Sequence, residues 1–302
     1  MICIQNKGRL GNQLFIYALY KELKMMYPNE TFVIDNSEIN SFGFDNELLN
    51  YNIDKDLIFI NDHRDKQYTK SFIQKVLLYY LSLRTKKMNP RELFEFEKKY
   101  QHFFNFFGLN FCTNGYIPIL SLKRKRNFFL GFYQSEKYFQ HVKESLLQDL
   151  NPIYQPNVKN KYLYDKMKNT NSVCLTVRRG DYVNHPVHDI CNLDYFNRAL
   201  NLIYDKIKNP IIFAFSDDIE WVKQNITFKG DVYFEDGTDT VYEKLRLMSS
   251  CKHFILSNST FSWWACYLSS NDEKIVISPN KWFNIDIPCE LINDKWIQLN
   301  ME

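Results

Sequence analysis

The second half of the sequence alternates short runs of β-branched and aromatic residues with helical patterns, and this alternation limits the fold more than any other feature. The runs at 172–177 and 253–257 are predominantly apolar, the pattern of strands buried on both faces. The predicted strands are 172–177, 210–216, 231–234, 253–257 and 274–278, and the predicted helices are 193–208, 219–225, 240–251 and 261–268. Strands that alternate with helices form βαβ units, so we predict an α/β fold with a parallel sheet.

The first half begins with the same pattern and then loses it. A strand at 1–5, a glycine-bearing turn, a helix at 14–26 and a strand at 31–35 are followed by an aromatic-rich, poorly patterned insertion at about 40–125. Within it we predict helices at 71–83 and 90–104 and a core position for the aromatic run 103–107, and after it a strand at 127–133 and a helix at 135–150. Pro152 and Pro156 flank a linker, so we expect two domains, 1–150 and 151–302.

Composition and charge exclude several classes of protein. The net charge of +3 is too small to make nucleic acid the main partner. The apolar runs are too short for a membrane span, and the first residues have no basic region or cleavage site. The seven cysteines form no C-x-x-C pair, which indicates a reduced, cytoplasmic protein without a thiolate metal site. The basic run 123–126 reads as a solvated loop, with weak peripheral contact to an anionic membrane as the alternative.

Two adjacent arginines follow the strand at 172–177. Arg178, Arg179, Gly180 and Asp181 stand where the strand ends, and open α/β sheets bind ligands at the carboxyl ends of their strands. Guanidinium groups grip phosphates in bidentate fashion, while Asp181 could brace an arginine or act as a base. The pattern favours a phosphate or pyrophosphate site over the alternative, a surface Arg–Asp pair.

Two further turns carry polar groups at the start of a helix. One contains Gly11, Asn12 and Gln13, and the other contains Asn258, Ser259, Thr260 and Phe261. Helix N-termini bind anions through free N–H groups, although Asn and Ser equally serve as helix caps. Together with the arginines, these turns predict a diphosphate ligand.

Three motifs in the chain are similar to those of glycosyltransferase family 11, the α-1,2-fucosyltransferases, which are related to α-1,6- and protein O-fucosyltransferases. They are G-R-L-G-N-Q-L-F, V-R-R-G-D-Y-V and L-M-S-S-C-K-H-F-I-L-S-N-S-T-F-S-W-W, in the same order as in that family. The resemblance implies a GT-B-like α/β fold in which two Rossmann-type halves with parallel sheets face a cleft. Residues 1–150 would be the acceptor-side domain, and residues 151–302 would bind the nucleotide sugar.

The resemblance also implies an activity. It is the inverting transfer of L-fucose from GDP-β-L-fucose to O2 of a terminal β-galactoside in a cell-surface glycan or oligosaccharide, without a metal ion or another cofactor. Arg178 would grip the β-phosphate, with Arg179 and Asp181 shaping that grip and Asp217 and Asp218 behind them. The expected donor-binding residues are Gly11, Asn12, Gln13, Arg178, Arg179, Asn258, Ser259, Thr260 and Phe261.

Two positions depart from the family pattern. Thr176 stands where relatives often have His, and Lys244 stands where they tend to have an Asp that can read the guanine edge. Lysine cannot accept hydrogen bonds from guanine N–H groups, so Glu243 or Asp239 would have to substitute.

The residues leave the general base and the function class open. Asp181, His188 and Asp189 are the candidate bases, and histidine has a suitable unperturbed pKa. A transferase that uses another nucleotide sugar is one alternative function. A non-catalytic protein that binds a nucleotide sugar or a glycan is the other.

Overall fold

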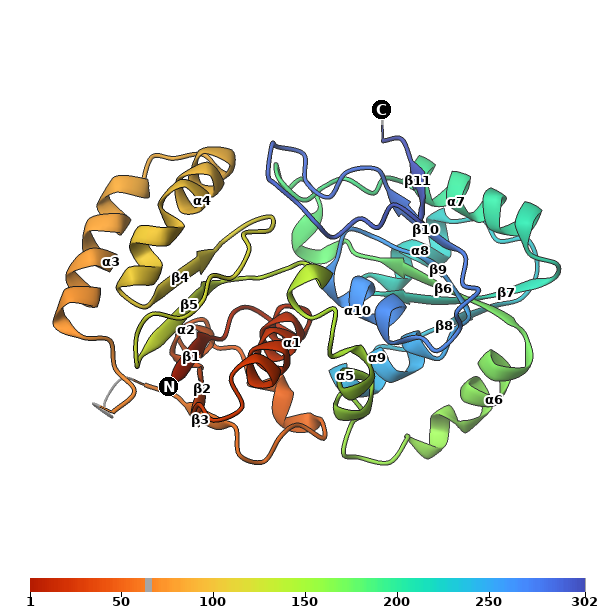
Figure 1. Cartoon of the computed structure of the whole chain (residues 1–302). Helices are drawn as coiled ribbons and strands as arrows, with labels where there is room; N and C mark the ends of the chain where they lie inside the picture. The colour runs from red at the N-terminus through yellow and green to blue at the C-terminus, as the bar shows by residue number, and fades with distance from the viewer. Residues whose placement is uncertain (63–66, 302) are drawn as a thin grey trace. The chain divides into compact units, whose positions relative to one another are not determined.

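The computed structural model describes residues 1–62 and 67–301, which divide into two compact units. Unit 1 comprises Met1–Leu150 and Asp286–Glu290, and unit 2 comprises Asn151–Ile285 and Leu291–Glu302 (Figure 1). The short return segment is fastened to unit 1 by ion pairs from Arg91 to Asp286 and from Lys137 to Glu290, each at 2.6 Å. Each unit contains a parallel sheet with helices around it, so the predicted α/β fold is confirmed.

The sheet of unit 1 has the strand order β3-β2-β1-β5-β4, and its strand pairs are all parallel. Its strands are β1 Ile2–Gln5, β2 Phe32–Asp35, β3 Ile58–Ile60, β4 Leu109–Cys112 and β5 Asn127–Gly131. The central strand β1 has β2 on one side and β5 on the other. The strands β2 and β3 therefore lie on one side of β1, and the later strands β5 and β4 lie on the other, so the order of the strands reverses between β1 and β5.

The helices of unit 1 confirm some predictions and correct one. They are α1 Leu10–Met26, α2 Ser37–Ser41, α3 Phe72–Thr85, α4 Pro90–Phe106 and α5 Lys143–Asp149, with 3₁₀ turns at Glu47–Asn50 and Glu136–Tyr138. Capping boxes, in which Ser71 pairs with Gln74 and Asn89 with Glu92, fix the starts of α3 and α4. The predicted continuous helix 135–150 is wrong, because the buried Tyr138 hydroxyl bonds to both backbone polar groups of Ile117 and holds the chain in a short turn.

The aromatic run 103–107 is only partly core, contrary to the prediction. Phe104 is buried in the cluster under α3, whereas Phe103 and Phe106 are 49% and 56% exposed. The run lies on the last turns of α4, and only one face of a helix can point into the core.

The sheet of unit 2 has the strand order β11-β10-β9-β6-β7-β8, again with parallel pairs. Its strands are β6 Asn171–Val177, β7 Pro210–Ser216, β8 Val232–Phe234, β9 His253–Ile255, β10 Val276–Pro279 and β11 Ile297–Leu299, of which β11 was not predicted. Its helices are α6 Lys161–Asn169, α7 Leu193–Lys206, α8 Ile219–Asn225, α9 Val241–Ser249 and α10 Thr260–Leu268, with 3₁₀ turns at Val158–Asn160 and Gly180–Tyr182.

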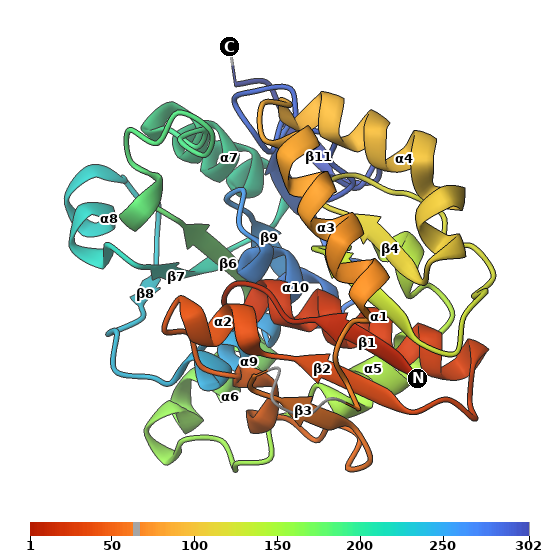
Figure 2. The ribbon, with the colours of Figure 1, turned by 90° about the vertical axis from the view of Figure 1, so that its left-hand side faces the viewer.

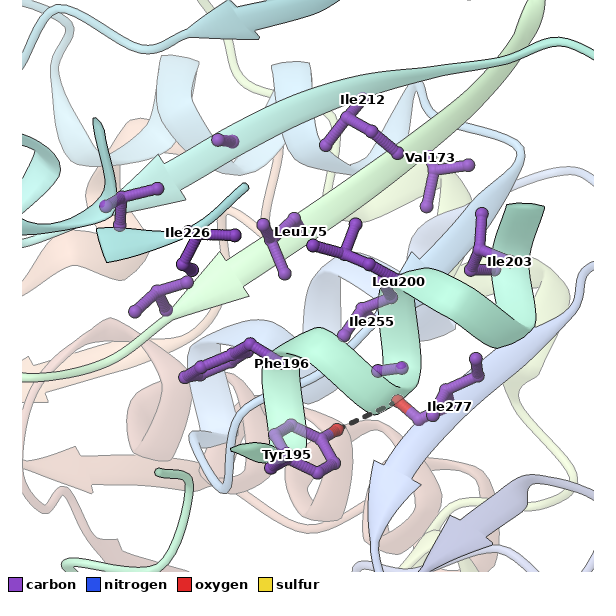
Figure 3. Close-up of a cluster of buried hydrophobic side chains, with 14 of the residues drawn as sticks. Val173, Leu175, Tyr195, Phe196, Leu200, Ile203, Ile212, Ile226, Ile255 and Ile277 are labelled. Carbon is purple, nitrogen blue, oxygen red and sulfur yellow. Dashed lines mark hydrogen bonds between the residues drawn. The ribbon is translucent and has the colours of Figure 1, made fainter. Parts of the chain in front are cut away.

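The core of unit 2 lies between β6 and α7 (Figure 3). Leu175 and Leu200 are buried in it, and each such side chain contributes about 1.5–3 kcal/mol when fully buried. The buried hydroxyl of Tyr195 donates to the carbonyl oxygens of Leu256, at 2.5 Å, and Ile277, at 3.4 Å. This bond joins α7 to the end of β9 and to β10, and so holds the strand ends in register near the predicted anion site.

Among the helices that the structure describes, none combines the length and the apolar character needed to cross a membrane.

Candidate functional site

The strand order of unit 2 brings two of the predicted turns to one place. From the central strand β6 the chain proceeds to β7 and β8 on one side, whereas β9, β10 and β11 lie on the other. Ligands of open α/β sheets bind outside the carboxyl ends of the strands at such a switch point. Arg178 follows β6 and Ser259 follows β9, its neighbour, so both lie at this edge of the sheet.

Thr176 ties these two strand ends together. Its hydroxyl accepts a hydrogen bond from the backbone N–H of Ser257 at 2.9 Å and donates to the carbonyl oxygen of Ile255 at 3.2 Å. The side chain is 3% exposed. Thr176, which stands where relatives often have His, therefore fixes the spacing between the ends of β6 and β9.

Carboxylates hold the guanidinium of Arg178 from two sides. Its Nη1 lies 2.6 Å from Oδ2 of Asp217, and its Nη2 donates to Oδ1 of Asp181. The guanidinium also lies over the ring of Tyr182, 5.3 Å from the ring centre. These ion pairs use only part of the five N–H donors of a guanidinium, so Arg178 is fixed in orientation and still able to bind an anion.

Arg179 points toward α8 instead. Its guanidinium carbon lies 3.8 Å from the ring centre of Trp221, and its Nε lies 3.3 Å from Oδ2 of Asp218. Its backbone N–H donates to Oδ1 of Asp217 at 2.8 Å, which fixes the carboxylate that holds Arg178. The geometry thus gives Arg179 a positioning role, and its contact with a donor stays a prediction.

Gly180 leaves room for Asp217, which gives a testable consequence. A Cβ on Gly180 would lie 2.5 Å from Oδ2 of Asp217, so Gly180→Ala must displace that carboxylate and with it Arg178. For the transferase activity that the family resemblance implies, we expect kcat to fall by about ten- to a hundredfold, the effect of misplacing a catalytic group by roughly 1 Å. Steady-state kinetics and urea unfolding would check this, and unchanged kcat with normal stability would contradict it.

The second turn, before α10, separates into two roles. Ser259 occupies the N-cap position of α10, but its side chain makes no capping hydrogen bond, so the interpretation of this serine as a simple cap is not supported. Asn258 is buried, and its amide nitrogen donates to the carbonyl oxygens of His188 and Trp282, each at 3.0 Å. Asn258 therefore holds the loop that contains His188, while Ser259, Thr260 and Phe261 are half-buried at the helix start.

Among the candidate bases, His188 lies against Tyr182. The ring of His188 stacks on that of Tyr182, with centres 4.8 Å apart, and burial together with the neighbouring His185 lowers the pKa of His188 below its usual 6.5. His188 is therefore neutral at pH 7 and able to accept a proton. Asp181 is held by Arg178, and Asp189 accepts the backbone N–H of Asn184 at 2.8 Å.

The candidate guanine-reading residues are occupied by the protein itself. The buried Glu243 accepts four hydrogen bonds, and Asp239 accepts one from Asn160 at 3.0 Å and lies 3.3 Å from Nζ of Lys159. The donors to Glu243 are the backbone N–H of Asn157 at 2.9 Å, Nδ2 of Asn160 at 3.1 Å, the hydroxyl of Tyr164 at 3.0 Å and Nη1 of Arg246 at 2.9 Å. A carboxylate offers about four lone-pair sites. Guanine contact by either residue stays a prediction, and the contacts of Glu243 favour an anchoring role.

Lys244 also has a partner close to these carboxylates. Its Nζ lies 3.2 Å from Oε2 of the buried Glu235, which directly follows β8. Among the described residues, Glu235, Asp236 and Asp239 could together approach one metal ion. Because Lys159 and Lys244 already neutralise these carboxylates, we assign no metal site to them.

The first turn lies at the corresponding switch point of unit 1. Asn12 accepts a hydrogen bond from Nε2 of Gln134 at 2.8 Å, and Gln134 follows β5, the neighbour of β1. Arg9, not Asn12, occupies the N-cap position of α1, so Asn12 does not cap this helix. Gly8, with φ of 61°, lets the turn approach Asn12 closely, since a Cβ there would lie 2.3 Å from its Nδ2.

Gln13 and Gly11 belong to the scaffold of this turn. The fully buried amide of Gln13 donates to the carbonyl oxygens of Gly8 and Asp45, at 3.0 and 2.9 Å, and accepts the backbone N–H of Glu47 at 2.9 Å. Gly11 is buried in the first turn of α1. Their contact with a donor stays a prediction.

Sequence reasoning missed Gln134, Tyr182 and Trp221. Gln134 follows a predicted strand, so the rule that found Arg178 could have found it as well. Tyr182 lies inside the V-R-R-G-D-Y-V motif, but no sequence pattern indicates that it stacks on His188. Trp221 lies outside the three motifs and is found only from the structure, where the Arg179 guanidinium lies over its ring.

The chain is similar in sequence to known glycosyltransferases. Residues 1–298 match the sequence profile of the family described as Glycosyl transferase family 11. An alpha-1,2-colitosyltransferase of Escherichia coli is 31% identical over 312 residues, which cover 97% of this chain and 96% of that protein. Galactoside alpha-(1,2)-fucosyltransferase 1 of Bos taurus is 29% identical over 137 residues, which cover 42% of this chain and 38% of that protein.

A solved structure confirms the fold class. NodZ, an alpha-1,6-fucosyltransferase soaked with GDP-fucose, matches with a TM-score of 0.55 at 14% identity, over 95% of this chain and 99% of that chain. The two Rossmann-type units are thus those of a GT-B-like fold.

Proposed function

The chain belongs to glycosyltransferase family 11 and is a glycosyltransferase, and from this premise we propose that it transfers L-fucose from GDP-β-L-fucose to O2 of a terminal β-galactoside with inversion at the anomeric carbon. The names of its relatives support an α-1,2 linkage, because one is an alpha-1,2-colitosyltransferase and another a galactoside alpha-(1,2)-fucosyltransferase.

The single observation that carries the proposal is the placement of Arg178. Its guanidinium stands at the switch point of the unit 2 sheet, held by Asp217 and Asp181, and the N-terminus of α10 starts after the neighbouring strand. A guanidinium and a helix N-terminus both favour a doubly charged diphosphate.

The proposed reaction is a single displacement. O2 of the galactoside attacks C1 of fucose while the bond from C1 to the β-phosphate oxygen breaks, and the electron pair of that bond leaves with GDP. Arg178 and the backbone N–H groups at the start of α10 stabilise the negative charge that grows on the phosphate. Because these groups supply the stabilisation, we propose that the reaction needs no metal ion.

The proton of the attacking hydroxyl passes to a base or to water. His188 is neutral at pH 7, since its pKa is lowered, and its ring stacks on the same tyrosine that the Arg178 guanidinium covers. If His188 is this base, kcat/KM falls only when the pH drops below the lowered pKa, where the imidazole becomes charged.

A second donor is favoured by one observation. The relative that is 31% identical over nearly the whole chain is a colitosyltransferase, and colitose is fucose without the 3-hydroxyl group. A site that hydrogen-bonds this hydroxyl would reject colitose strongly, whereas a site that does not would accept both sugars.

The test is transfer to lactose from GDP-fucose and from GDP-colitose, with UDP- and ADP-sugars as controls. We expect an α-1,2-linked product from a GDP-sugar, identified by NMR, at a rate that a chelator leaves unchanged. Preference for a UDP- or ADP-sugar would overturn the donor assignment. Binding of GDP without transfer to any galactoside would overturn the enzymatic proposal in favour of a binding protein.

A further inference from the structure

Helix α3 exposes large apolar side chains to solvent. Phe72 is 80% exposed, Tyr79 68% and Leu83 59%. Positions spaced by four, seven, eight and eleven residues share one side of a helix. We call this side the α3 face; it consists of the exposed residues Phe72, Ile73, Val76, Tyr79, Tyr80 and Leu83.

The opposite side of α3 packs against the hydrophobic core of unit 1. Leu77, Leu78 and Leu81 pack on the cluster that contains Phe104, and the side-chain amide of Gln74 donates to the carbonyl oxygen of Phe107 at 2.8 Å. The helix is therefore firmly attached to unit 1, beside α4 (Figure 2). The α3 face is thus a second apolar side of the helix, which is exposed and lies outside the core of unit 1.

The charged residues within α3 and next to it in the sequence have one sign. From residue 67 to residue 91 the sequence contains no Asp or Glu. Lys75, Arg84, Lys86 and Lys87 are exposed in or directly after α3. The face is thus bordered by cations without compensating acidic residues in the same segment.

The basic run 123–126 passes close to the first turn of α3. A Cβ on Gly108 would lie 3.3 Å from Cβ of Arg124 and 3.3 Å from Nε2 of Gln74, so Arg124 lies close to the first turn of α3. The Arg124 guanidinium also covers the exposed ring of Phe106 at 4.6 Å. The basic run therefore adds positive charge near the first turn of α3, on the side of the buried Gln74 and not within the α3 face itself.

We propose that the α3 face binds the surface of an anionic phospholipid bilayer. The phenylalanine, leucine, isoleucine and valine side chains would enter the boundary between headgroups and acyl chains, the tyrosine rings would lie at the headgroup level, and the cations would contact lipid phosphates. The helix is too short to span the bilayer and suits a position in the plane of the interface. This inference goes beyond the proposed function and does not depend on it.

The charge pattern is what selects a membrane over a second copy of the chain. Two copies joined symmetrically through the α3 face would bring the same basic groups against each other, and like charges at an interface are unfavourable. An anionic lipid surface instead attracts every one of these cations.

The experiment is sedimentation of the full-length protein with vesicles, without donor or acceptor. We expect binding to vesicles of phosphatidylcholine mixed with phosphatidylglycerol, weak binding to phosphatidylcholine alone, and weakening by salt. The triple variant Phe72→Ser, Tyr79→Ser and Leu83→Ser should lower the partition coefficient by about tenfold or more, because it removes most of the inserted apolar area. Lys86→Glu with Lys87→Glu should also lower it by about tenfold or more.

Two matched controls change exposed apolar residues elsewhere. Phe42→Ser and Val158→Ser, at positions 67% and 86% exposed, should leave vesicle binding unchanged. Equal binding of the triple variant and the wild type, or no preference for phosphatidylglycerol, would overturn the proposal. So would sedimentation velocity showing a wild-type dimer that the triple variant converts to monomer, because the occupant of the face would then be a second copy.

Discussion

Replacing Arg178 with alanine is expected to lower kcat of sugar transfer by about a hundred- to a thousandfold, which corresponds to about 2.7–4 kcal/mol of transition-state stabilisation. The loss follows from the geometry, since Asp217 and Asp181 already orient the guanidinium before any ligand arrives. A donor group that is oriented in advance stabilises leaving-group charge without reorganisation during the reaction. Steady-state kinetics with GDP-fucose and lactose would measure the change.

Two variants control for charge and for unfolding. Arg178→Lys keeps the positive charge but loses the planar fork, so we expect it to recover only a small part of the activity. Arg198→Ala removes another arginine of unit 2 that is paired with an aspartate, Asp194, at 2.7 Å and should leave kcat unchanged. If Arg178→Ala is folded and retains near-normal turnover, the proposed stabilisation of the leaving group is wrong.

The strand positions of unit 2 were predictable from sequence because local and tertiary requirements agree there. Residues 172–177 are predominantly apolar and rich in β-branched residues, and the structure places β6 inside its sheet, where both faces are buried. The rule that ligands bind at carboxyl ends then located Arg178. The rule could not give the strand order, and only that order shows that β9 is the neighbour of β6.

Long-range contacts decided the features that sequence patterns did not reveal. The segment 135–150 has a helical composition, yet the bonds of Tyr138 to Ile117 prevent a single helix. The positioning roles of Arg179, Asn258 and Gln13 arise from partners such as Trp221, His188 and Asp45. A sequence motif shows which residues occur together in a turn. It does not show which of their side chains already bind distant parts of the protein and so have a positioning role.

The sequence predicts that Glu243 reads the guanine base, whereas its hydrogen bonds in the structure favour an anchoring role, and a substitution distinguishes the two. It is buried and accepts hydrogen bonds from the segment that enters unit 2 and from Arg246 of its own helix. We expect Glu243→Ala to lower the free energy of unfolding by about 3 kcal/mol, because removing one partner of a buried pair leaves the other charge uncompensated. Urea unfolding of the full chain would measure the change.

The control for this prediction is an exposed pair at the same sequence spacing. Glu220 pairs with Lys223 three residues later at 2.7 Å, as Glu243 does with Arg246, but both of its members are exposed. Glu220→Ala should therefore cost less than about 1 kcal/mol. At low urea, where Glu243→Ala remains folded, KM for the GDP-sugar should be close to the wild-type value. Normal stability combined with a strongly raised KM would show instead that the carboxylate reads the base, because an anchoring residue acts on unfolding and a base-reading residue acts on donor binding.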